Sequence, residues 1–479
     1  MAEAKTGQAG RTGGKLLADA LVAQGVTHAF CVPGESYLDL LDGLYSVRNR
    51  LQLVTCRFEA GAIHMAEAYG KLTGKPGVAI VTRGPGACHA AIGVHVAQQD
   101  STPLVLLVGQ IPVEETDRET FQEVDYRRMF SPIAKWVTQI DDEKRIPELM
   151  AHAFDVAVSG RPGPVVIDIP KDVQIMKARY TKPGVISHKT YKPQVKGDLA
   201  AIEAAVDMLA AAERPILYTG GGVINSGPVA SQLLRELAKA TGAPVTSTLM
   251  GLGSVPDDHP QFLGMLGMHG TYEANLAMHG CDVMFNIGAR FDDRVTGRLN
   301  AFSPTSKKIH ADIDPSSINK NVAVDVPIVG DAGAVLAAMI EAWKADEAPQ
   351  DKGAIAAWWR LIDEWRGKKC LAYRQEGKII KPQHAVQRLY DITRELGRET
   401  FITTEVGQHQ MWAAQYFGFD KPNRWMTSGG LGTMGYGLPA AMGVQIAHPD
   451  ALVIDIAGEA SILMNIQEMG TLAQYRLPV

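Results

Sequence analysis

A glutamate late in the chain stands where a predicted strand gives way to a predicted helix. Residues 451–456 form an apolar, β-branched run typical of a buried strand, and Gly458 and Glu459 follow it closely. In an open α/β sheet, phosphates and their metal ions bind at this end of a strand, because the turn presents backbone N–H groups and the helix start is partly positive. Glu459 is therefore a candidate metal ligand, although acidic helix starts also occur in sheets that bind nothing.

Two segments in the first part of the chain also place polar side chains after apolar runs. Glu59 enters an Ala-rich helical stretch, where an acidic residue can simply offset the helix dipole. Residues 83–87 (Arg-Gly-Pro-Gly-Ala) form a tight turn of a kind common in sheets without any ligand. Neither segment is specific by itself.

The middle of the chain carries a stronger signal. Residues 288–297 (Gly-Ala-Arg-Phe-Asp-Asp-Arg-Val-Thr-Gly) place two arginines and two aspartates directly after an apolar run. Phosphate-bearing ligands bind at this edge of a parallel sheet, and arginine holds phosphate through paired hydrogen bonds. Residues 220–222 (Gly-Gly-Gly) allow a close backbone approach at the same edge, although no complete G-x-G-x-x-G is present. We therefore predict nucleotide binding in this block.

Short apolar runs that alternate with helical stretches must position these residues. In the first block the predicted strands are 26–32, 77–82, 103–108 and 164–169, and the predicted helices are 36–44 and 60–73. The second block has predicted strands at 215–219, 281–288, 308–314 and 326–331 and a helix at 228–241. The third has strands at 400–404 and 451–456, a helical stretch at 462–470, and the start of a further strand at 477–479. This alternation predicts an α/β protein with three successive doubly wound parallel-sheet domains, the third incomplete.

Two connectors separate the blocks. Residues 176–198 are rich in Lys, Pro, Gly and Thr and are predicted to be an interdomain linker. A polar and helical connector covers roughly residues 347–381, and Trp358, Trp359 and Trp365 are spaced there like one face of a packed helix. A chain of 479 residues is long enough for roughly three domains.

Composition excludes several classes of function. The net charge is -5 and the basic residues are spread along the chain, so we expect no nucleic-acid surface. The five cysteines are widely spaced without a C-x-x-C pair, which favours a reducing cytoplasm over a disulfide framework or a zinc site. The first ten residues lack the apolar core of a signal peptide, and no apolar run has the roughly 18 residues of a membrane span. We expect a soluble cytoplasmic protein that does not enter the membrane.

Four segments resemble the thiamine-diphosphate-dependent enzymes, and among them the catalytic large subunit of acetolactate synthase, also called acetohydroxyacid synthase. They are residues 264–270, 288–297, 406–412 and 428–439. The resemblance is long and specific from about residue 213 onward. It is looser before that point, where residues 31–36 (Cys-Val-Pro-Gly-Glu-Ser) replace the Tyr-Pro-Gly-Gly usual in acetolactate synthases.

The resemblance implies three domains and a carboligase reaction. Residues 12–178 are expected to bind the pyrimidine of the cofactor, residues 196–345 to form a central FAD- or nucleotide-binding-like domain, and residues 380–479 to form a truncated diphosphate-binding domain. Pyruvate would lose carbon dioxide on thiamine diphosphate, and the remaining two-carbon unit would join a second 2-oxo acid. The product, an acetohydroxy acid, enters branched-chain amino acid biosynthesis.

The resemblance also assigns the catalytic residues. Glu59 matches the glutamate that hydrogen-bonds the aminopyrimidine and so promotes removal of the thiazolium C2 proton. Gln122, Val32, Pro33 and Gly34 line the same end of the cofactor, and Lys171 lies on the substrate approach.

Further residues are assigned to cofactor binding. Met434, with Gly432 beside it, matches the residue that keeps the cofactor bent. The diphosphate and its Mg²⁺ would contact Val406, Gly407, Gln408, His409, Gly458, Glu459, Ala460 and Ser461, with Glu459 as the metal ligand. A structural, redox-inactive FAD would contact Arg161, Gly220, Gly221, Gly222, Thr248, Leu249, Met250, Gly267, Met268, His269, Gly288, Ala289, Arg290, Asp292, Arg294, Val295, Asp312, Ile313 and Asp331.

Two departures from the family pattern lower the expected activity of the chain. Residues 458–460 (Gly-Glu-Ala) stand where the family has Gly-Asp-Gly or Gly-Asp-Ala, and the extra methylene of Glu459 must be accommodated around a strictly octahedral Mg²⁺. The second metal-binding element of the family, an Asn-rich turn, would lie beyond Val479. The alternatives are another thiamine-diphosphate-dependent 2-oxo acid decarboxylase or lyase and a non-catalytic FAD-binding paralogue.

The resemblance implies partners as well. In this family one subunit supplies the residue matched by Glu59 and a second supplies the diphosphate contacts, so we expect a homodimer or homotetramer. A regulatory small subunit is a further possible partner.

Overall fold

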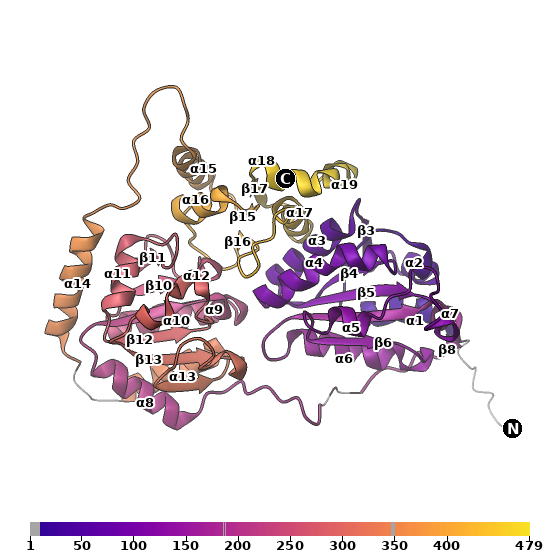
Figure 1. The fold of residues 1–479 in the computed structure, drawn as a ribbon, viewed down its shortest axis with the longest axis horizontal. Coiled ribbons are helices and arrows are strands. Elements are labelled where there is room, and N and C mark those ends of the chain that lie inside the picture. The colour runs from indigo at the N-terminus through magenta and orange to yellow at the C-terminus, as the bar shows by residue number, and fades with distance from the viewer. Residues whose placement is uncertain (1–9, 185, 187, 346–349) are drawn as a thin grey trace. The chain divides into compact units, whose positions relative to one another are not determined.

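The computed structural model describes residues 10–184, 186, 188–345 and 350–479, which form two compact units (Figure 1). Unit 1 contains the chain up to Tyr191 together with residues 430–479, and unit 2 contains residues 192–429. Residues 380–479, expected to be one domain, contribute to both units, and the expected domain boundaries remain a prediction. Most of the N-terminal segment considered as a signal peptide, two residues of the first connector and residues 347–349 of the second lie outside the described residues.

Unit 1 is built on a six-stranded sheet with the strand order β3-β2-β4-β5-β7-β6. All neighbouring strands in it are parallel. The strands are β2 (His28–Cys31), β3 (Gln52–Thr55), β4 (Gly77–Val81), β5 (Leu104–Gln110), β6 (Trp136–Gln139) and β7 (Pro164–Pro170). The short strands β1 (Arg11–Thr12) and β8 (Lys177–Ala178) pair antiparallel, and β17 (Leu452–Ile456) lies in the C-terminal segment.

Helices cover both faces of this sheet, as the apolar strands predict. Along β5, Val105 and Leu107 pack into one hydrophobic cluster, whereas Leu104 and Leu106 pack into another, because successive side chains point to opposite faces. The first cluster includes residues of α1 (Gly13–Ala23), α2 (Leu38–Ser46) and α6 (Ile146–Val158). The second includes residues of α3 (Glu59–Thr73), α4 (Pro85–Asp100) and α17 (Gly437–Ala447). The predicted doubly wound parallel sheet is therefore confirmed for this unit.

The remaining helices of unit 1 are short. They are α5 (Tyr126–Phe130), α7 (Lys171–Ile175), α18 (Glu459–Ile462) and α19 (Met469–Tyr475), with the 3-10 helices η1 (Glu35–Tyr37), η2 (Val113–Glu115), η3 (Glu143–Arg145) and η7 (Leu463–Glu468).

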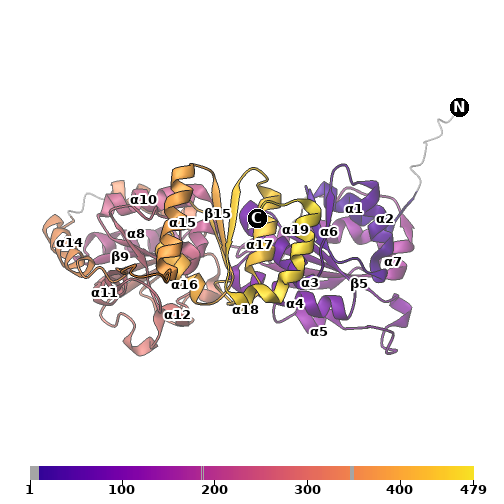
Figure 2. The ribbon, with the colours of Figure 1, turned by 90° about the horizontal axis from the view of Figure 1, so that it is seen from above.

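The C-terminal segment of unit 1 is joined to α3 and α4 by a buried polar network. Helix α17 packs along α3, which lies nearly 400 residues earlier in the sequence (Figure 2). Lys71 Nζ lies 3.1 Å from Glu67 Oε1 and 2.9 Å from Asp100 Oδ2, and all three side chains are almost fully buried. The Tyr436 hydroxyl donates to Glu67 Oε2 at 2.7 Å, and the Gly430 N–H donates to Asp100 Oδ1 at 2.6 Å. Buried charges must be paired in this way, so the network fixes where residues 430–436 lie.

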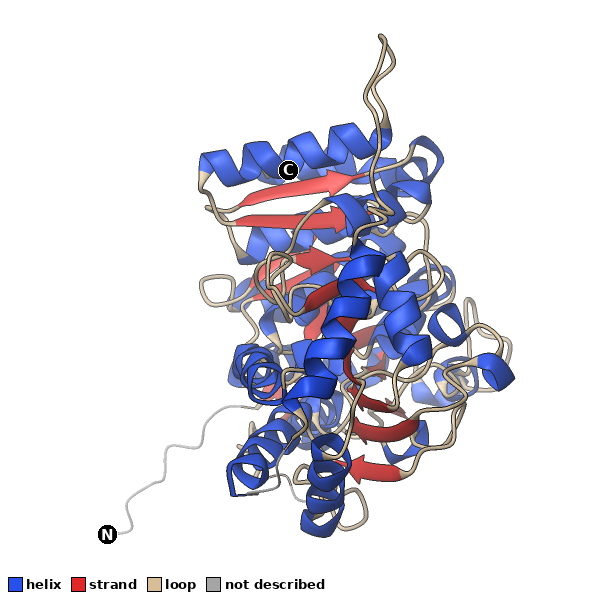
Figure 3. Ribbon diagram, turned by 90° about the vertical axis from the view of Figure 1, so that its left-hand side faces the viewer, coloured by secondary structure: helices blue, strands red, loops and turns tan. Residues whose placement is uncertain are grey.

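Unit 2 contains a second parallel sheet between helices, with the order β11-β10-β9-β12-β13-β14 (Figure 3). Its strands are β9 (Pro215–Thr219), β10 (Val245–Ser247), β11 (Phe262–Met265), β12 (Val283–Ile287), β13 (Lys307–Asp312) and β14 (Val326–Val329). Two further strands of this unit, β15 (Thr400–Thr404) and β16 (Trp425–Met426), pair in parallel.

Helices of unit 2 complete the alternation that the sequence predicts. They are α8 (Leu199–Ala210), α9 (Gly221–Asn225), α10 (Pro228–Thr241), α11 (Tyr272–Gly280), α12 (Asp293–Thr296), α13 (Ala332–Ala345), α14 (Lys352–Arg366), α15 (Pro382–Leu396) and α16 (Gln408–Tyr416), with η4 (Leu249–Gly251), η5 (Leu299–Ala301) and η6 (Pro315–Ser317). The tryptophan-bearing connector is α14, where Trp358 is buried and meets the Trp365 ring edge-to-face at 5.6 Å.

Three local predictions need correction. Residues 36–44 begin as the 3-10 helix η1 before α2 forms. The helical stretch at 462–470 is interrupted, because Asn465 has φ -128° and ψ 24° and its side chain bonds the Gly435 carbonyl. Residues 477–479 form no strand, and Leu477 and Val479 pack half-buried against the second cluster.

A buried histidine makes the stability of unit 1 depend on pH. Burial lowers the pKa of His64, in α3, to about 3, and its ring meets Tyr436 edge-to-face at 5.4 Å. The unfolded chain, with a histidine pKa of about 6.5, binds this proton at pH values where the folded chain does not. The resulting stability is complete above pH 6.5 and is lost as the pH falls toward 3, by up to about 1.4 kcal/mol per pH unit.

Urea unfolding at pH 7.5, 6.5 and 5.5 measures this effect. The free energy of unfolding of wild type should fall over this range more steeply than that of His64→Gln. His279→Gln, at the exposed end of α11, serves as the control and should keep the wild-type pH dependence. Parallel curves for wild type and His64→Gln would show that burial of His64 does not set the dependence.

Candidate functional site

The carboxyl ends of four unit 1 strands carry predicted site residues. Val32, Pro33 and Gly34 follow β2, and Glu59 follows β3. Gln122 follows β5, and Lys171 follows β7 directly. Because the carboxyl ends of parallel strands meet at one edge of a sheet, the fold brings these residues to the same edge.

Glu59 is the first residue of α3 and is 9% exposed. Its Oε2 lies 2.9 Å from His89 Nδ1 in α4, and a Cβ placed on Gly86 would lie 3.3 Å from its Oε1. The carboxylate therefore lies beside the first turn of α4, where a small residue leaves room next to it. His89 was not predicted as a site residue, because nothing in the spacing of positions 59 and 89 links them.

Glycines allow the turns of this edge to lie close together. A Cβ on Gly34 would lie 2.4 Å from Thr82 Cβ, and a Cβ on Gly84, which has φ +58°, would lie 2.8 Å from Gln122 Cβ. Gln122 itself has φ +65°. The turn after β4 thus separates the two predicted cofactor-lining segments and touches both.

Lys171 takes part in an ion-pair cluster with a residue that the sequence did not assign to the site. Its Nζ lies 3.0 Å from Glu35 Oε2, and Glu35 Oε1 accepts from Arg83 Nη2 at 2.5 Å. The hydrogen bond from Lys171 is the largest cause that lowers the pKa of the Glu35 carboxyl. Glu35 belongs to the segment that departs from the family pattern, and Arg83 was noted only as part of a turn.

Glu468 holds the start of α3 in place. Its Oε1 accepts from the Arg57 and Phe58 N–H groups at 3.0 and 2.9 Å, and its Oε2 accepts from Thr471 Oγ1 at 2.7 Å. A Cβ on Gly61 would lie 2.5 Å from Glu468 Oε1. Burial raises the pKa of this carboxyl, and the two backbone donors oppose that shift. Glu468 therefore satisfies the free N–H groups just before Glu59 in the manner of a helix cap.

The fold brings Gly432 and Met434 near the turn after β17. The Gly435 N–H donates to Ser461 Oγ at 3.2 Å, and Asn465 Nδ2 donates to the Gly435 carbonyl at 2.6 Å. Gly432 has φ +76°, and Met434 is 37% exposed. The predicted residues of the loop and of positions 458–461 are therefore neighbours within unit 1.

Glu459 begins α18 and is exposed, as is Ala460, whereas Gly458 is half-buried. Within the described residues no group of three or more His, Cys, Asp or Glu side chains has a metal-binding arrangement. Mg²⁺ commonly takes only one or two protein carboxylates and completes its shell with phosphate oxygens and water. The assignment of Glu459 as a metal ligand remains a prediction.

Residues 406–409 lie in unit 2, where Gln408 begins α16. Gly407 has φ +157°, and a Cβ there would lie 2.7 Å from His409 Cε1. A side chain at position 407 would therefore collide with the His409 ring, at the point where the diphosphate contacts are predicted.

The predicted nucleotide residues of unit 2 gather at the carboxyl edge of its sheet. A Cβ on Gly220 would lie 2.4 Å from the Gly288 carbonyl oxygen, and one on Gly222 would lie 2.6 Å from Gly288 Cα. The Met268 N–H donates to the Arg294 carbonyl at 2.9 Å. Residues 264–270 and 288–297, which the resemblance connects, are thus neighbours in the fold.

His269 has unused hydrogen-bonding capacity at this edge. Both ring nitrogens of His269 are buried and have no hydrogen-bond partner among the described residues, while Met268 is 58% exposed. Asp331 Oδ1 instead accepts from Ser226 Oγ at 2.8 Å and from the Ala334 N–H, so it caps α13.

The other predicted contacts have local structural partners. Asp292 accepts from the Arg294 N–H at 3.0 Å and lies 3.4 Å from Arg290 Nη2. Asp312 accepts from the Asp314 N–H at 2.8 Å, and the Thr248 side chain accepts from the Gly251 N–H. Leu249 and Met250 lie in η4, Gly221 begins α9, and Ala289, Val295 and Ile313 lie in or beside the same loops.

Arg161 belongs to unit 1, whereas the other predicted FAD contacts belong to unit 2. Its Nε donates to Ser101 Oγ at 2.8 Å, and its Nη2 donates to the Gln98 carbonyl at 3.1 Å. These contacts give it a structural role after α4.

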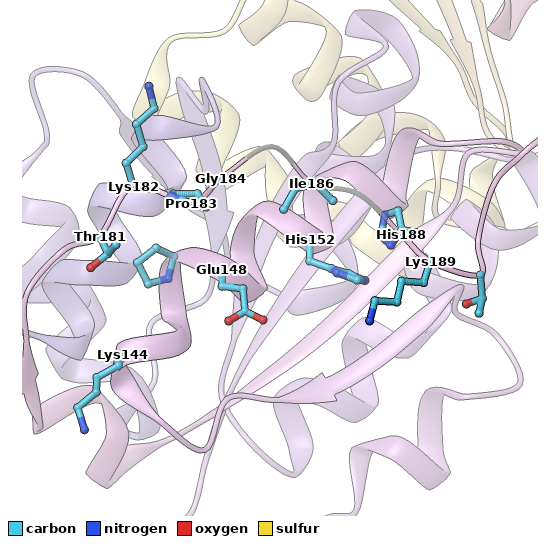
Figure 4. Close-up of a pocket in the computed structure, with 12 residues that line it drawn as sticks. Lys144, Glu148, His152, Thr181, Lys182, Pro183, Gly184, Ile186, His188 and Lys189 are labelled. Carbon is cyan, nitrogen blue, oxygen red and sulfur yellow. The ribbon is translucent and has the colours of Figure 1, made fainter.

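A separate hollow of about 710 Å³ opens on unit 1 between α6 and residues 181–184, 186 and 188–190 (Figure 4). Lys144, His152 and His188 are among its lining residues, and His188 Nε2 lies 2.6 Å from Asp155 Oδ2. None of the predicted site residues lines it. It is therefore distinct from the carboxyl edge described above.

Models of three protein domains match the sequence. The N-terminal TPP binding domain of thiamine pyrophosphate enzymes matches residues 11–129, the central domain of these enzymes matches residues 202–339, and their C-terminal TPP binding domain matches residues 405–479.

Curated proteins match almost the whole chain. The acetolactate synthase isozyme 3 large subunit of Escherichia coli K12 is 44% identical over 470 residues, which are 98% of this chain and 81% of that protein. The acetolactate synthase large subunit of Buchnera aphidicola subsp. Acyrthosiphon pisum has the same identity and coverage. A probable acetolactate synthase large subunit of Methanocaldococcus jannaschii is 43% identical over 473 residues, 98% of this chain and 79% of that protein. In the described part of the chain, no helix is both long and apolar enough to span a membrane.

The Glu468 contacts predict a loss of stability when this side chain is removed. Glu468→Ala leaves the Arg57 and Phe58 N–H groups without their acceptor and should lower the free energy of unfolding by about 1–3 kcal/mol in urea titrations. Gln467→Ala, at the exposed neighbouring position, is the control and should stay within about 0.5 kcal/mol of wild type. An equal, small effect of both substitutions would contradict the capping role.

Proposed function

This chain belongs to the acetolactate synthase large-subunit family of thiamine pyrophosphate enzymes, and we propose that it joins two 2-oxo acids at the carboxyl edge of the unit 1 sheet. Its relatives make it a carboligase of the acetolactate synthase type that depends on thiamine diphosphate. The finer proposal is that pyruvate is decarboxylated and condensed with a second 2-oxo acid to an acetohydroxy acid for branched-chain amino acid biosynthesis.

The observation that carries the proposal is the environment of Glu59. A nearly buried carboxylate at a helix start, next to a turn kept open by Gly84 and Gly86, suits a planar, nitrogen-bearing ring such as the pyrimidine of the cofactor. The Arg57 and Phe58 N–H groups just before it are already bound by Glu468, so the Glu59 carboxylate is left for another partner besides His89. The residues present therefore fit thiamine diphosphate at this edge.

Each side chain at this edge has a proposed task. Thiamine diphosphate, when bound, supplies the carbon nucleophile and takes up the electrons released by decarboxylation. Glu59 holds a proton at its carboxylate beside the pyrimidine, and Gln122, Val32, Pro33 and Gly34 orient that ring. Lys171 attracts the anionic substrate, and Met434 supports the bent form of the cofactor.

We further propose Mg²⁺ and FAD as ligands. Glu459 would hold the metal, and residues 406–409 and 458–461 would contact the diphosphate, since both segments follow strands directly. FAD would lie at the carboxyl edge of the unit 2 sheet in a structural role, where the buried ring nitrogens of His269 lack partners among the described residues. Its contacts would come from the positions given above.

Assembly and location are also proposals. Because the expected site combines residues of two subunits, we propose a homodimer or homotetramer, with a regulatory small subunit as a further partner. The relatives are large subunits by name, which supports such a partner. All five cysteines are free, and this suits the cytoplasm.

A second candidate function rests on Glu35 and Ser36. This segment differs from the acetolactate synthase pattern and lies beside Arg83 and Lys171, so a different 2-oxo acid or acyl substrate is the alternative. A screen of 2-oxo acids and acyl-CoA substrates that detected only pyruvate condensation would exclude this alternative. Bound thiamine diphosphate in the purified chain would count against a non-catalytic FAD-binding paralogue.

The role of Glu59 is tested by its neutral isostere. Glu59→Gln should lower acetolactate formation from pyruvate at least 100-fold at saturating thiamine diphosphate and Mg²⁺, because a general acid or base contributes about 10²–10⁴-fold. Glu203→Gln, on the exposed face of α8, is the matched control and should retain wild-type activity. An active wild type with a fully active Glu59→Gln would exclude this residue from the reaction.

A further inference from the structure

Arg83 has hydrogen-bonding capacity that the described fold does not use. The residue is 7% exposed, its Nε donates to the Phe121 carbonyl at 2.9 Å, and its Nη2 donates to Glu35. Its Nη1 is buried and has no hydrogen-bond partner among the residues that the structure describes. A buried guanidinium N–H without an acceptor is costly, so a partner from outside the chain would stabilise it.

The charges around Arg83 also leave room for an anion. Arg83 and Lys171 share the single carboxylate of Glu35, and within the described residues neither cation has a second ion pair. The nearby Asp172 carboxylate accepts instead from the Val113 and Val173 N–H groups. Two cations facing one carboxylate retain about one positive charge, which suits one additional carboxylate.

Glu35 is the most exposed partner in this cluster. Its side chain is 52% exposed and that of Lys171 is 40% exposed, whereas the side chain of Arg83 is 9% exposed. The exposed Lys171–Glu35 pair contributes little free energy, and the half-exposed Glu35 carboxylate can return to water when another carboxylate takes its place, while Phe121 holds Arg83. The arrangement places a buried guanidinium beside an exposed, replaceable carboxylate at the carboxyl edge of the sheet.

We propose that Arg83 and Lys171 form the subsite for the carboxylate of the 2-oxo acid, and that Glu35 occupies this subsite until the substrate arrives. The inference rests on the proposed function, which supplies the 2-oxo acid. It goes further by naming Arg83 as the residue that binds the carboxylate and Glu35 as the residue that competes for it. Because Gln122 follows Phe121, the subsite adjoins the predicted cofactor-lining residues.

Binding of oxamate, an unreactive isostere of pyruvate, tests the subsite without turnover. Isothermal titration of the full chain, alone and with thiamine diphosphate and Mg²⁺, should show Arg83→Met weakening oxamate binding at least 10-fold. Lys171→Gln should weaken it about threefold or more, and Glu35→Gln should strengthen it, because the internal competitor loses its charge. Pyruvamide, which lacks the carboxylate, should bind wild type and Arg83→Met equally weakly.

Arg128→Met is the matched control, since the Arg128 side chain is 90% exposed in unit 1. It should bind oxamate like wild type, and circular dichroism checks that each variant is folded. If Arg83→Met does not fold, Lys171→Gln and Glu35→Gln decide the question. Unchanged binding in Arg83→Met or Lys171→Gln, weaker binding in Glu35→Gln, or no oxamate binding by wild type in either condition would overturn the subsite.

Acetolactate formation, measured on the same samples, separates this inference from the proposed function. If wild type binds oxamate through Arg83 but makes no acetolactate, the proposed reaction is wrong and the proposed carboxylate subsite is supported. If wild type makes acetolactate but its oxamate binding does not depend on Arg83, the proposed reaction is supported and the proposed subsite is wrong.

Discussion

The start of α3 depends on a carboxylate that lies 410 residues further along the chain. Glu468 accepts the Phe58 and Arg57 N–H groups immediately before Glu59, and no residue of α3 itself caps this helix end. Without the capping carboxylate, these two backbone donors would lose their acceptor and the first turn of the helix would be held less firmly. The direction of the Glu59 side chain, and therefore the proposed chemistry, depends on this contact.

A second set of buried polar contacts supports the first. Lys71 pairs with Glu67 and Asp100. Glu67 accepts from the Tyr436 hydroxyl and Asp100 accepts from the Gly430 N–H, so the loop that carries Met434 is fixed against α3 and α4. Such a network contributes specificity of position more than net stability, because desolvation offsets most of the attraction between its charges. It allows two segments from opposite ends of the sequence to present one site edge within unit 1.

The sequence predicted the sheets and their helices well, because strand burial on two faces and helical periodicity are local signals. Residues 228–241 were predicted as a helix and form α10 with the same bounds. Glycines that permit close turns, such as Gly34 and Gly220, were also found from sequence, as was the α/β class. The contacts of His89 and Glu468 with the start of α3 were not predicted, because a contact between residues far apart in the sequence produces no periodic pattern in it. The break at Asn465 depends on the Gly435 carbonyl, which only the folded chain brings near. The roles of the predicted site residues remain predictions, since they need a bound ligand.

A crystal structure of the chain with thiamine diphosphate and Mg²⁺ would show directly which carboxylate meets the pyrimidine. We expect a pyrimidine nitrogen within about 2.6–3.2 Å of the Glu59 carboxylate, at the carboxyl edge of the unit 1 sheet, with Glu468 still bound to the Arg57 and Phe58 N–H groups. A cofactor bound at this edge through a different carboxylate, or bound elsewhere on the chain, would contradict it.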